Sequence, residues 1–273
     1  MALRNRDRKR TAAGGRGRRL ALGALLALLV VACGWDAART WLAVSDGASS
    51  GSADEATLEQ TYAAGGEDGE GEATQLSSLD VPDYSGDEDA GYVEVNGNVP
   101  LFDDDDIVAD AYESYLPLDP LGRATGAVAC LSAELMPTEE RESISEVHPT
   151  GWHSDTYDFI DGELLYNRSH LIAYQLTGEN ANERNLITGT RYLNATTMLS
   201  YENEVADYVE RTGNHVMYRV TPVYDGDNLL ASGVLMEAWS VEDDGAGVCF
   251  CVYAYNVQPG VSIDYATGDN SAE

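Results

Sequence analysis

The stretch from residue 194 to residue 255 constrains the fold more than any other part of the chain. It begins with apolar residues at the spacing of an amphipathic helix, and Gly213 supplies the stop signal. Three strand patterns follow, at 216–224, 228–236 and 247–255, and the sequence Asp-Gly-Asp separates the first two. One helix followed by strands joined by short turns predicts an α+β fold with a mostly antiparallel sheet.

Weaker strand signals precede this stretch. Asn96-Gly97 is a hairpin turn signal between two short alternating runs, and Asp161-Gly162 predicts a second hairpin. Residues 127–131 form a short apolar strand pattern. The tail after Asp264 carries no clear pattern, and we expect it to be frayed.

The first forty residues carry a basic segment and then an apolar run. Residues 20–32 are about as long as a signal-peptide core, whereas a membrane span needs about 20 residues. Cations before such a run predict export of the rest of the chain. Two interpretations stay open: a lipobox that ends in an acylated Cys33, or an uncleaved signal-anchor. We therefore expect residues 1–40 to be a signal peptide or membrane anchor of a bacterial extracellular or cell-surface protein.

Acidic residues dominate everything that follows. Residues 41–90 combine low hydrophobicity with high like charge, which predicts a disordered linker before a folded domain at 91–273. From residue 41 onward the chain has seven arginines, no lysines and 45 acidic residues. This balance argues against a protein held on nucleic acid by a broad basic face. An enzyme that acts on phosphodiesters would have to use a few placed arginines and a bound cation.

The cysteines leave two interpretations open. Cys130 is able to pair with Cys249 or Cys251 in an oxidising exterior, or all three are buried small residues. A zinc site is not predicted, because no histidine stands at ligand spacing from the Cys-x-Cys pair.

The residues with the clearest chemistry lie in the motif Asn167-Arg168-Ser169-His170 and downstream of it. Hydrolysis of a phosphodiester requires an activated water, a cation for the developing charge and help for the leaving oxygen. A neutral histidine suits the first task, and an amide oxygen such as that of Asn194 suits Mg²⁺. The guanidinium of Arg168 matches a phosphate.

The spacing predicts how these side chains are presented. Arg168 and His170 share a face if their segment is extended. On an α-helix, Asn194, Met198 and Glu202 lie on adjoining turns of one side, so Glu202 would reach a metal through bridging water.

At these residues the sequence is similar to the sugar-nonspecific DNA/RNA endonucleases of the ββα-metal (His-Me finger) class, in their secreted or surface-anchored bacterial branch. The signature of that family is Asp-Arg-Gly-His, then an asparagine, then a glutamate eight residues later. Here the pattern stands as Asn167-Arg168-Ser169-His170, Asn194 and Glu202. The resemblance extends from about Tyr92 to about Gly268. Asn167 and Ser169 depart from the commoner Asp and Gly, whereas the base and the ligand are retained.

The resemblance implies a ββα-metal motif on the sheet and a role for each residue. His170 would deprotonate the attacking water, and Asn194 would be the direct protein ligand of a hydrated Mg²⁺, or of Mn²⁺ or another divalent cation. Arg168 would stabilise the transition state, and Glu202 would fix metal-bound waters. The products in this class carry 5′-phosphates.

Other candidates carry weaker signals. Arg191 either touches substrate phosphate or pairs with one of the many acids. Trp152 and Tyr166 either stack on bases or pack in the core. His148, His153 and His215 lack catalytic company, and we assign them to structure or surface.

We therefore expect a metal-dependent, non-specific endonuclease that hydrolyses DNA and RNA outside the cell. Its partners would be nucleic acid and, through the N-terminal segment, a membrane, with no obligate protein partner. The alternative function is a non-catalytic acidic surface lipoprotein that acts as a binding module.

Overall fold

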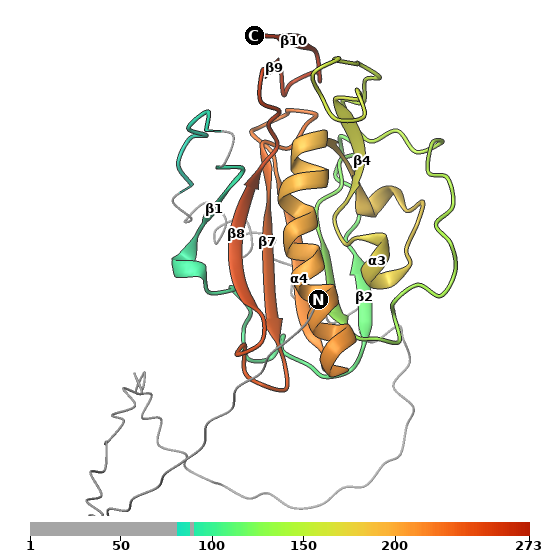
Figure 1. Ribbon diagram of the computed structural model, residues 1–273, viewed down its shortest axis with the longest axis vertical. Helices are drawn as coiled ribbons and strands as arrows, with labels where there is room; N and C mark the ends of the chain where they lie inside the picture. The colour runs from blue at the N-terminus through green and yellow to red at the C-terminus, as the bar shows by residue number, and fades with distance from the viewer. Residues whose placement is uncertain (1–80, 88–89) are drawn as a thin grey trace, which may run out of the picture. The chain divides into compact units, whose positions relative to one another are not determined.

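A six-stranded antiparallel sheet is the main element of the computed structural model, which describes residues 81–87 and 90–273 (Figure 1). The strand order is β1–β8–β7–β6–β3–β2. The strands are β1 (Tyr92–Glu94), β2 (Tyr112–Tyr115), β3 (Ala127–Leu131), β6 (Val216–Val223), β7 (Gly233–Ser240) and β8 (Cys249–Tyr255). The α+β fold with a mostly antiparallel sheet is thereby confirmed.

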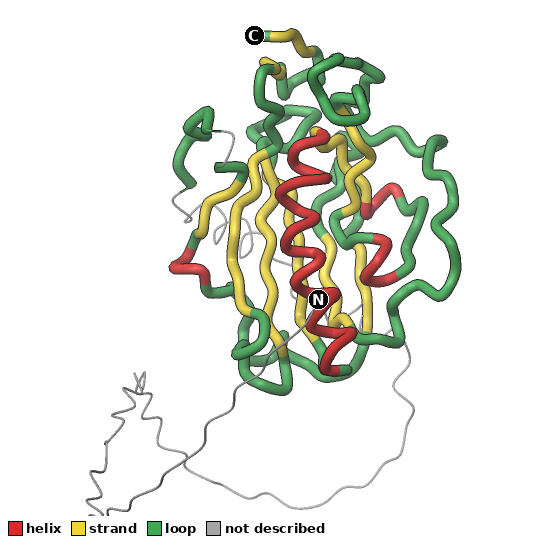
Figure 2. The backbone as a smooth tube through the Cα atoms, in the orientation of Figure 1, coloured by secondary structure: helices red, strands yellow, loops and turns green. Residues whose placement is uncertain are grey.

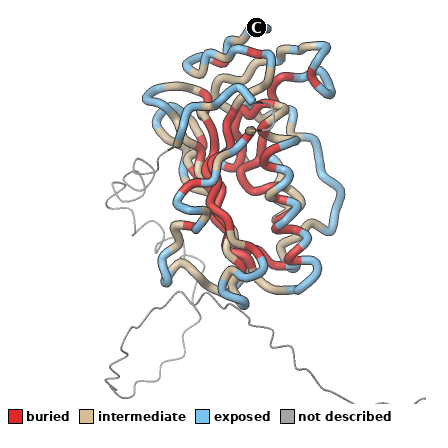
Figure 3. The backbone as a smooth tube through the Cα atoms, turned by 60° about the vertical axis from the view of Figure 1, so that its left-hand side comes forward, coloured by how far each residue is buried: buried red, intermediate tan, exposed pale blue. Residues whose placement is uncertain are grey.

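Helix α4 (Leu199–Thr212) lies across one face of this sheet (Figures 1 and 2). Its Val205 and Val209 are fully buried in one core cluster with Tyr218 of β6 and Val252 of β8. Buried residues are concentrated in the strands of the sheet (Figure 3). Burial of each such aliphatic side chain contributes about 1.5–3 kcal/mol relative to exposure. The helix ends at Gly213, whose φ of 71° is left-handed and whose N–H donates to the Val209 carbonyl oxygen. The stop signal in the sequence is confirmed.

The opposite face of the sheet is covered by apolar residues that flank β1 in the chain, Val81, Tyr84, Phe102, Ile107 and Val108. Arg219 and Glu237 form a buried ion pair there, with Nε 2.8 Å from Oε2. Glu237 Oε1 also accepts a hydrogen bond from the Leu101 N–H (2.7 Å), and Arg219 donates to the Leu101 carbonyl oxygen (3.2 Å). These bonds offset the cost of burying both charges and fix the chain at Leu101 on the sheet.

The N-terminal predictions fall mostly outside the described residues. The signal peptide or anchor at 1–40 lies there entirely, as does the linker up to residue 80. Residues 81–87 were predicted to be linker, yet they pack on the sheet, where Tyr255 Oη donates to the Pro82 carbonyl oxygen (2.7 Å). Within the described part of the chain, no helix has the length and apolar character that crossing a membrane requires.

A second antiparallel pair, β4 (Tyr166–His170) and β5 (Leu186–Thr190), stands beside the main sheet. The link between them holds α3 (Tyr174–Thr177) and the 3₁₀ turn η2 (Glu183–Asn185). After β5 the chain enters a π-helical segment, η3 (Leu193–Met198), which continues into α4. We call β4, β5, η3 and α4 the finger. It has the predicted β-hairpin and helix order.

Asn256 joins the finger to the main sheet. Its Oδ1 accepts a hydrogen bond from the Thr190 N–H of β5 (2.9 Å), and its Nδ2 donates to the carbonyl oxygens of Thr188 (3.1 Å) and Ala231 (2.9 Å). Because the Asn256 side chain is fully buried, all three bonds are protected from water.

Two local predictions are wrong because distant segments supply the strand partners. Gly97 does turn, with φ of 64°, but β1 pairs with β8 rather than with the residues just after the turn. The tail is ordered rather than frayed, since β10 (Asn270–Ala272) pairs with β9 (Val261–Ile263).

The second expected hairpin forms only in part. The turn at Asp161-Gly162 is present, but a single bridge, Thr156 to Leu164, joins its arms. Strand β4 pairs with β5 instead.

Cys130, Cys249 and Cys251 are free thiols, so the disulfide interpretation is not supported in the described residues. Burial raises the pKa of both Cys130 and Cys251 to about 12, which leaves these thiols unreactive near neutral pH.

Candidate active site

The residues singled out in the sequence line one open cavity of about 680 Å³ between the finger and the loop before β4. Its wall includes all five predicted site residues and one that the sequence did not indicate, Arg141. The five are Arg168, His170, Arg191, Asn194 and Glu202. Residues that lie up to 34 positions apart in the predicted set are therefore brought to the same opening.

His170 is the last residue of β4 and is only 6% exposed. Its Nε2 lies 2.8 Å from the Asn180 carbonyl oxygen, which can only accept a hydrogen bond. The ring proton is therefore assigned to Nε2, and Nδ1 carries the lone pair. Nδ1 lies 3.1 Å from an Arg141 guanidinium nitrogen.

Two effects keep the imidazole neutral. Burial and, to a smaller extent, the Arg141 charge lower the pKa of His170 to about 4, against the opposing effect of the Asn180 carbonyl. At neutral pH the ring is therefore uncharged, which is the state a proton acceptor requires.

Asn194 reaches the cavity from the π-helical segment. The segment starts directly after β5, where Thr190 Oγ1 accepts the Leu193 N–H (3.0 Å) and Gln258 Oε1 accepts the Tyr192 N–H (3.0 Å). Residues 193–198 form a π-helical segment rather than the expected α-helix. Of the three residues predicted to share one side, Asn194 and Glu202 line the cavity and Met198 is buried in the core. Single π turns recur at functional sites.

Glu202 is 7% exposed and lies at the cavity wall, in the first turn of α4. Burial raises its pKa to about 8, whereas the Arg141 charge acts in the opposite direction. Tyr218 Oη is fully buried nearby and lacks a hydrogen-bond partner within the described residues. A buried carboxyl of this kind is costly to ionise unless a cation is bound.

The donor set fits a hydrated divalent cation. Asn194 and Glu202 supply oxygen atoms, which Mg²⁺ prefers, and such an ion usually keeps several of its waters. Among the residues that the structure describes, no group of three or more His, Cys, Asp or Glu side chains could enclose a metal. Two oxygen-bearing side chains at the cavity, Asn194 and Glu202, suit an ion that takes few ligands from the protein.

Arg168 has contacts that differ from the predicted role. Its guanidinium donates to the carbonyl oxygens of Val147 and Ser145, the latter at 2.8 Å, and stacks 4.1 Å above the Trp152 ring. Its donors are thus directed largely at the loop before β4. Transition-state stabilisation by Arg168 stays a prediction.

Comparisons with known proteins show which family the chain belongs to. A family model described as DNA/RNA non-specific endonuclease matches residues 105–242, half of the chain. The chain belongs to this endonuclease family. Its fold is similar to that of NucA from Streptococcus agalactiae with magnesium bound, with a TM-score of 0.62 and 27% identity over 72% of this chain and 92% of NucA. The Sda1 nuclease with bound zinc gives 0.56 and 25% over 68% of this chain and 98% of Sda1. A comparison with curated proteins gives no match.

Arg141 is the residue of this nuclease that the sequence did not indicate as functional. It lies between Glu140 and Glu142 in a loop without periodicity, for which the sequence predicts no functional residue. The structure places its guanidinium beside His170. One signal was present: in a chain with so few cations, each arginine is a candidate for contact with phosphate.

Of the two contacts predicted for Arg191, the structure shows the ion pair with an acidic residue. Arg191 pairs with Asp161 at 2.8 Å, and the Asp161 side chain is 90% exposed. Exposed pairs of this kind are weak, and Arg191 lines the cavity wall, so its contact with substrate stays a prediction.

The remaining aromatic and histidine candidates make structural contacts. Tyr166 is buried and donates to the Gly268 carbonyl oxygen (2.9 Å), as the core interpretation predicts. Trp152 packs under Arg168. His153 contacts the Thr267 carbonyl oxygen, and His215 pairs with Glu242.

Proposed function

We propose that this family member is a metal-dependent endonuclease that cleaves DNA and RNA outside the cell, with His170 as general base. One observation carries the proposal. The neutral, Nε2-protonated His170, with its Nδ1 beside Arg141, lines the same cavity as Asn194 and Glu202. A base, oxygen ligands and guanidinium groups in one opening are the components that phosphodiester hydrolysis needs.

His170 acts first. The Asn180 carbonyl oxygen retains the proton on Nε2, so Nδ1 is the atom that accepts a proton from the attacking water. The water oxygen bonds to phosphorus as the P–O3′ bond breaks, O3′ takes a proton from solvent and leaves as a hydroxyl, and the phosphate stays on the 5′ end of the other fragment.

Arg141 is placed to bind the scissile phosphate, because its guanidinium already lies at the base. When a phosphate draws this guanidinium away, Nδ1 loses a neighbouring positive charge and gains a negative one. Both changes raise the pKa of His170 from about 4 toward its ordinary value and make the ring a stronger base.

Asn194 and Glu202 would hold Mg²⁺, with Mn²⁺ as an alternative, Asn194 directly and Glu202 through water. When bound, the ion supplies positive charge beside the phosphate and favours departure of the leaving oxygen. NucA has been solved with magnesium and Sda1 with zinc, which supports a divalent ion in this family and leaves its identity to be measured.

The test uses the purified full chain with plasmid DNA and with RNA, in Mg²⁺ or in chelator. We expect metal-dependent degradation to fragments with 5′-phosphates, which a ligase rejoins without prior phosphorylation. His170→Ala is expected to remove at least about 10³-fold of the rate, since both base and orientation are lost. His215→Ala, which changes a histidine paired with Glu242, is the matched control and retains activity.

Intact plasmid and RNA in the presence of folded wild-type protein and Mg²⁺ would instead support the non-catalytic binding module. Export through residues 1–40 is part of the same proposal. The test measures nuclease activity outside intact cells. We expect activity there for the full chain and none for a variant that lacks residues 1–40.

A further inference from the structure

We propose that Arg168 is a positioning residue that fastens the loop carrying Arg141 and thereby sets Arg141 against His170. The inference rests on the proposed function, because it concerns how the same site is assembled. It assigns Arg168 a task different from direct stabilisation of the transition state.

The geometry of the Arg168 side chain supports this task. Two of its three guanidinium nitrogens are used on the loop, since Nε donates to the Val147 carbonyl oxygen and one terminal nitrogen donates to that of Ser145. The flat face of the group lies 4.1 Å from the Trp152 ring centroid, which holds the guanidinium in one plane. Two carbonyl acceptors and a ring together define the position of a planar fork.

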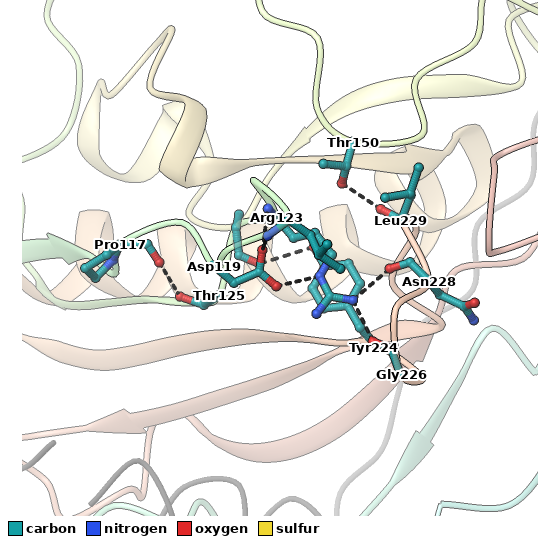
Figure 4. Close-up of polar contacts among 11 residues, drawn as sticks. Pro117, Asp119, Arg123, Thr125, Thr150, Tyr224, Gly226, Asn228 and Leu229 are labelled. Atoms are coloured by element: carbon teal, nitrogen blue, oxygen red, sulfur yellow. Dashed lines mark hydrogen bonds and ion pairs between the residues drawn. The ribbon is translucent and has the colours of Figure 1, made fainter. Parts of the chain in front are cut away.

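The loop needs such a fastening. At one end Tyr174 Oη donates to the Glu139 carbonyl oxygen (2.9 Å). At the other end Thr150 Oγ1 donates to the Leu229 carbonyl oxygen (2.6 Å), as Figure 4 shows, and the Thr150 carbonyl accepts from Thr188 Oγ1 (2.9 Å). Between these anchors, the bonds that join the loop to other parts of the described chain come from Arg168 and from Arg141.

Strand β4 carries both His170 and Arg168, the residue that binds the loop. Arg168 stands two residues before His170 on β4 and is opposite Thr188 on β5. Because the hairpin is rigid, the distance from the Arg168 fork to the imidazole is fixed. The Ser145 and Val147 carbonyls are thereby held relative to the base, and so is Arg141 four residues before Ser145.

A double-mutant cycle separates positioning from direct contact with phosphate. The values of kcat and KM are measured with Mg²⁺ on one oligonucleotide for the full-length wild type, Arg141→Ala, Arg168→Ala and the double variant. We expect each single change to lower kcat/KM about 10²-fold, since a displacement of about 1 Å has that effect. In the Arg141→Ala background, Arg168→Ala is expected to cost less than about 3-fold more. An equal loss in both backgrounds overturns the proposal.

Two further measurements keep the proposal testable if Arg168→Ala folds poorly. Arg168→Lys keeps the charge but loses the planar fork, and it is expected to behave as Arg168→Ala does in both backgrounds. Amide hydrogen exchange of residues 141–148 is expected to accelerate in either Arg168 variant while exchange in β6 and β7 is unchanged. Unaltered exchange of the loop overturns the proposal.

The result is distinguishable from failure of the proposed function. If the wild-type protein has no nuclease activity, the proposed function itself is wrong. If the wild type is active and the losses from Arg141→Ala and Arg168→Ala are additive, only the positioning role of Arg168 is wrong. Arg211→Ala, which takes away an exposed guanidinium at the far end of α4, is the control for the change in net charge.

Discussion

The carboxamide oxygen of Asn256 accepts a hydrogen bond from the backbone N–H of Thr190 (2.9 Å), and this bond joins the finger to the end of a strand in the main sheet. Asn256 follows directly after β8, whereas Thr190 ends β5. The two segments are 66 residues apart in sequence. One side chain therefore couples the stability of the sheet to the placement of the site.

Asn256→Ala is expected to lower the free energy of unfolding by about 2–4 kcal/mol. The change leaves the buried Thr190 N–H and the carbonyl oxygens of Thr188 and Ala231 without their partner. Denaturation in urea measures the loss. Asn228→Ala is the control, since its carboxamide points away from the neighbouring contacts in Figure 4. A loss below about 1 kcal/mol would contradict the coupling.

The serine at position 169 is accommodated by a glycine across the hairpin. A Cβ atom on Gly189 would lie 2.8 Å from Ser169 Cβ and closer still to its Oγ. Gly189→Ala is therefore expected to destabilise the protein by about 1–3 kcal/mol through overpacking. Ser169→Gly, placed in the Gly189→Ala protein, is expected to restore at least half of that loss.

Ser169→Ala alone is the control for this pair. Its hydroxyl is buried and has no hydrogen-bond partner in the described residues, so its removal is expected to change stability by less than about 0.5 kcal/mol. Thermal unfolding of the four proteins gives the comparison. Additive losses in the double variant would show that the two side chains do not meet.

His170 makes stability depend on pH in a defined direction. Its folded-state pKa is lowered to about 4 from an ordinary value of 6.5, so between these values the unfolded chain binds the additional proton. The stability contributed by the neutral ring is complete above pH 6.5 and is lost as pH falls toward 4. At pH 5 the loss amounts to about 2 kcal/mol.

The difference between wild type and His170→Gln isolates this contribution, because Glu202 and all other acids are common to both proteins. We expect the stability difference between the two proteins to shift by about 2 kcal/mol from pH 7 to pH 5, at the expense of the wild type. Urea titrations at the two pH values measure it. Parallel pH profiles would contradict the lowered pKa.

Asn194 is expected to be required for stabilisation by Mg²⁺. A ligand that binds the folded state at 100 times its dissociation constant raises the free energy of unfolding by about 2.7 kcal/mol. Asn194→Ala is expected to remove most of this gain while leaving metal-free stability nearly unchanged. Asn203→Ala, an exposed change on α4, retains it. A wild-type response of the Asn194→Ala protein to Mg²⁺ would contradict the assignment.

The sequence predicted those features that depend on local pattern. The strand at 127–131, the glycine stop after α4 and the shared cavity of His170, Asn194 and Glu202 follow from periodicity, turn chemistry and a spaced motif. The pairing of β1 with β8 could not be predicted in this way. The two strands lie about 160 residues apart, and the Asn-Gly turn after β1 favours a local hairpin instead.

Arg141 escaped prediction for a related reason. Its position depends on side-chain contacts made by a loop without periodicity, and no local signal encodes such contacts. The π turn at Leu193–Met198 also escaped prediction, because an α-helical spacing was applied to residues that form it.

That π turn has a consequence for anyone who shortens or idealises the protein. A π turn differs from an α turn by one additional residue, so deleting one residue between Leu193 and Met198 would produce a more regular helix. That segment supplies Asn194 to the cavity wall and Leu193, Thr197 and Met198 to the buried interior, so the same deletion would remove or displace one of these residues. Redesign toward a regular helix at this point would therefore change either the candidate site or the core beneath it.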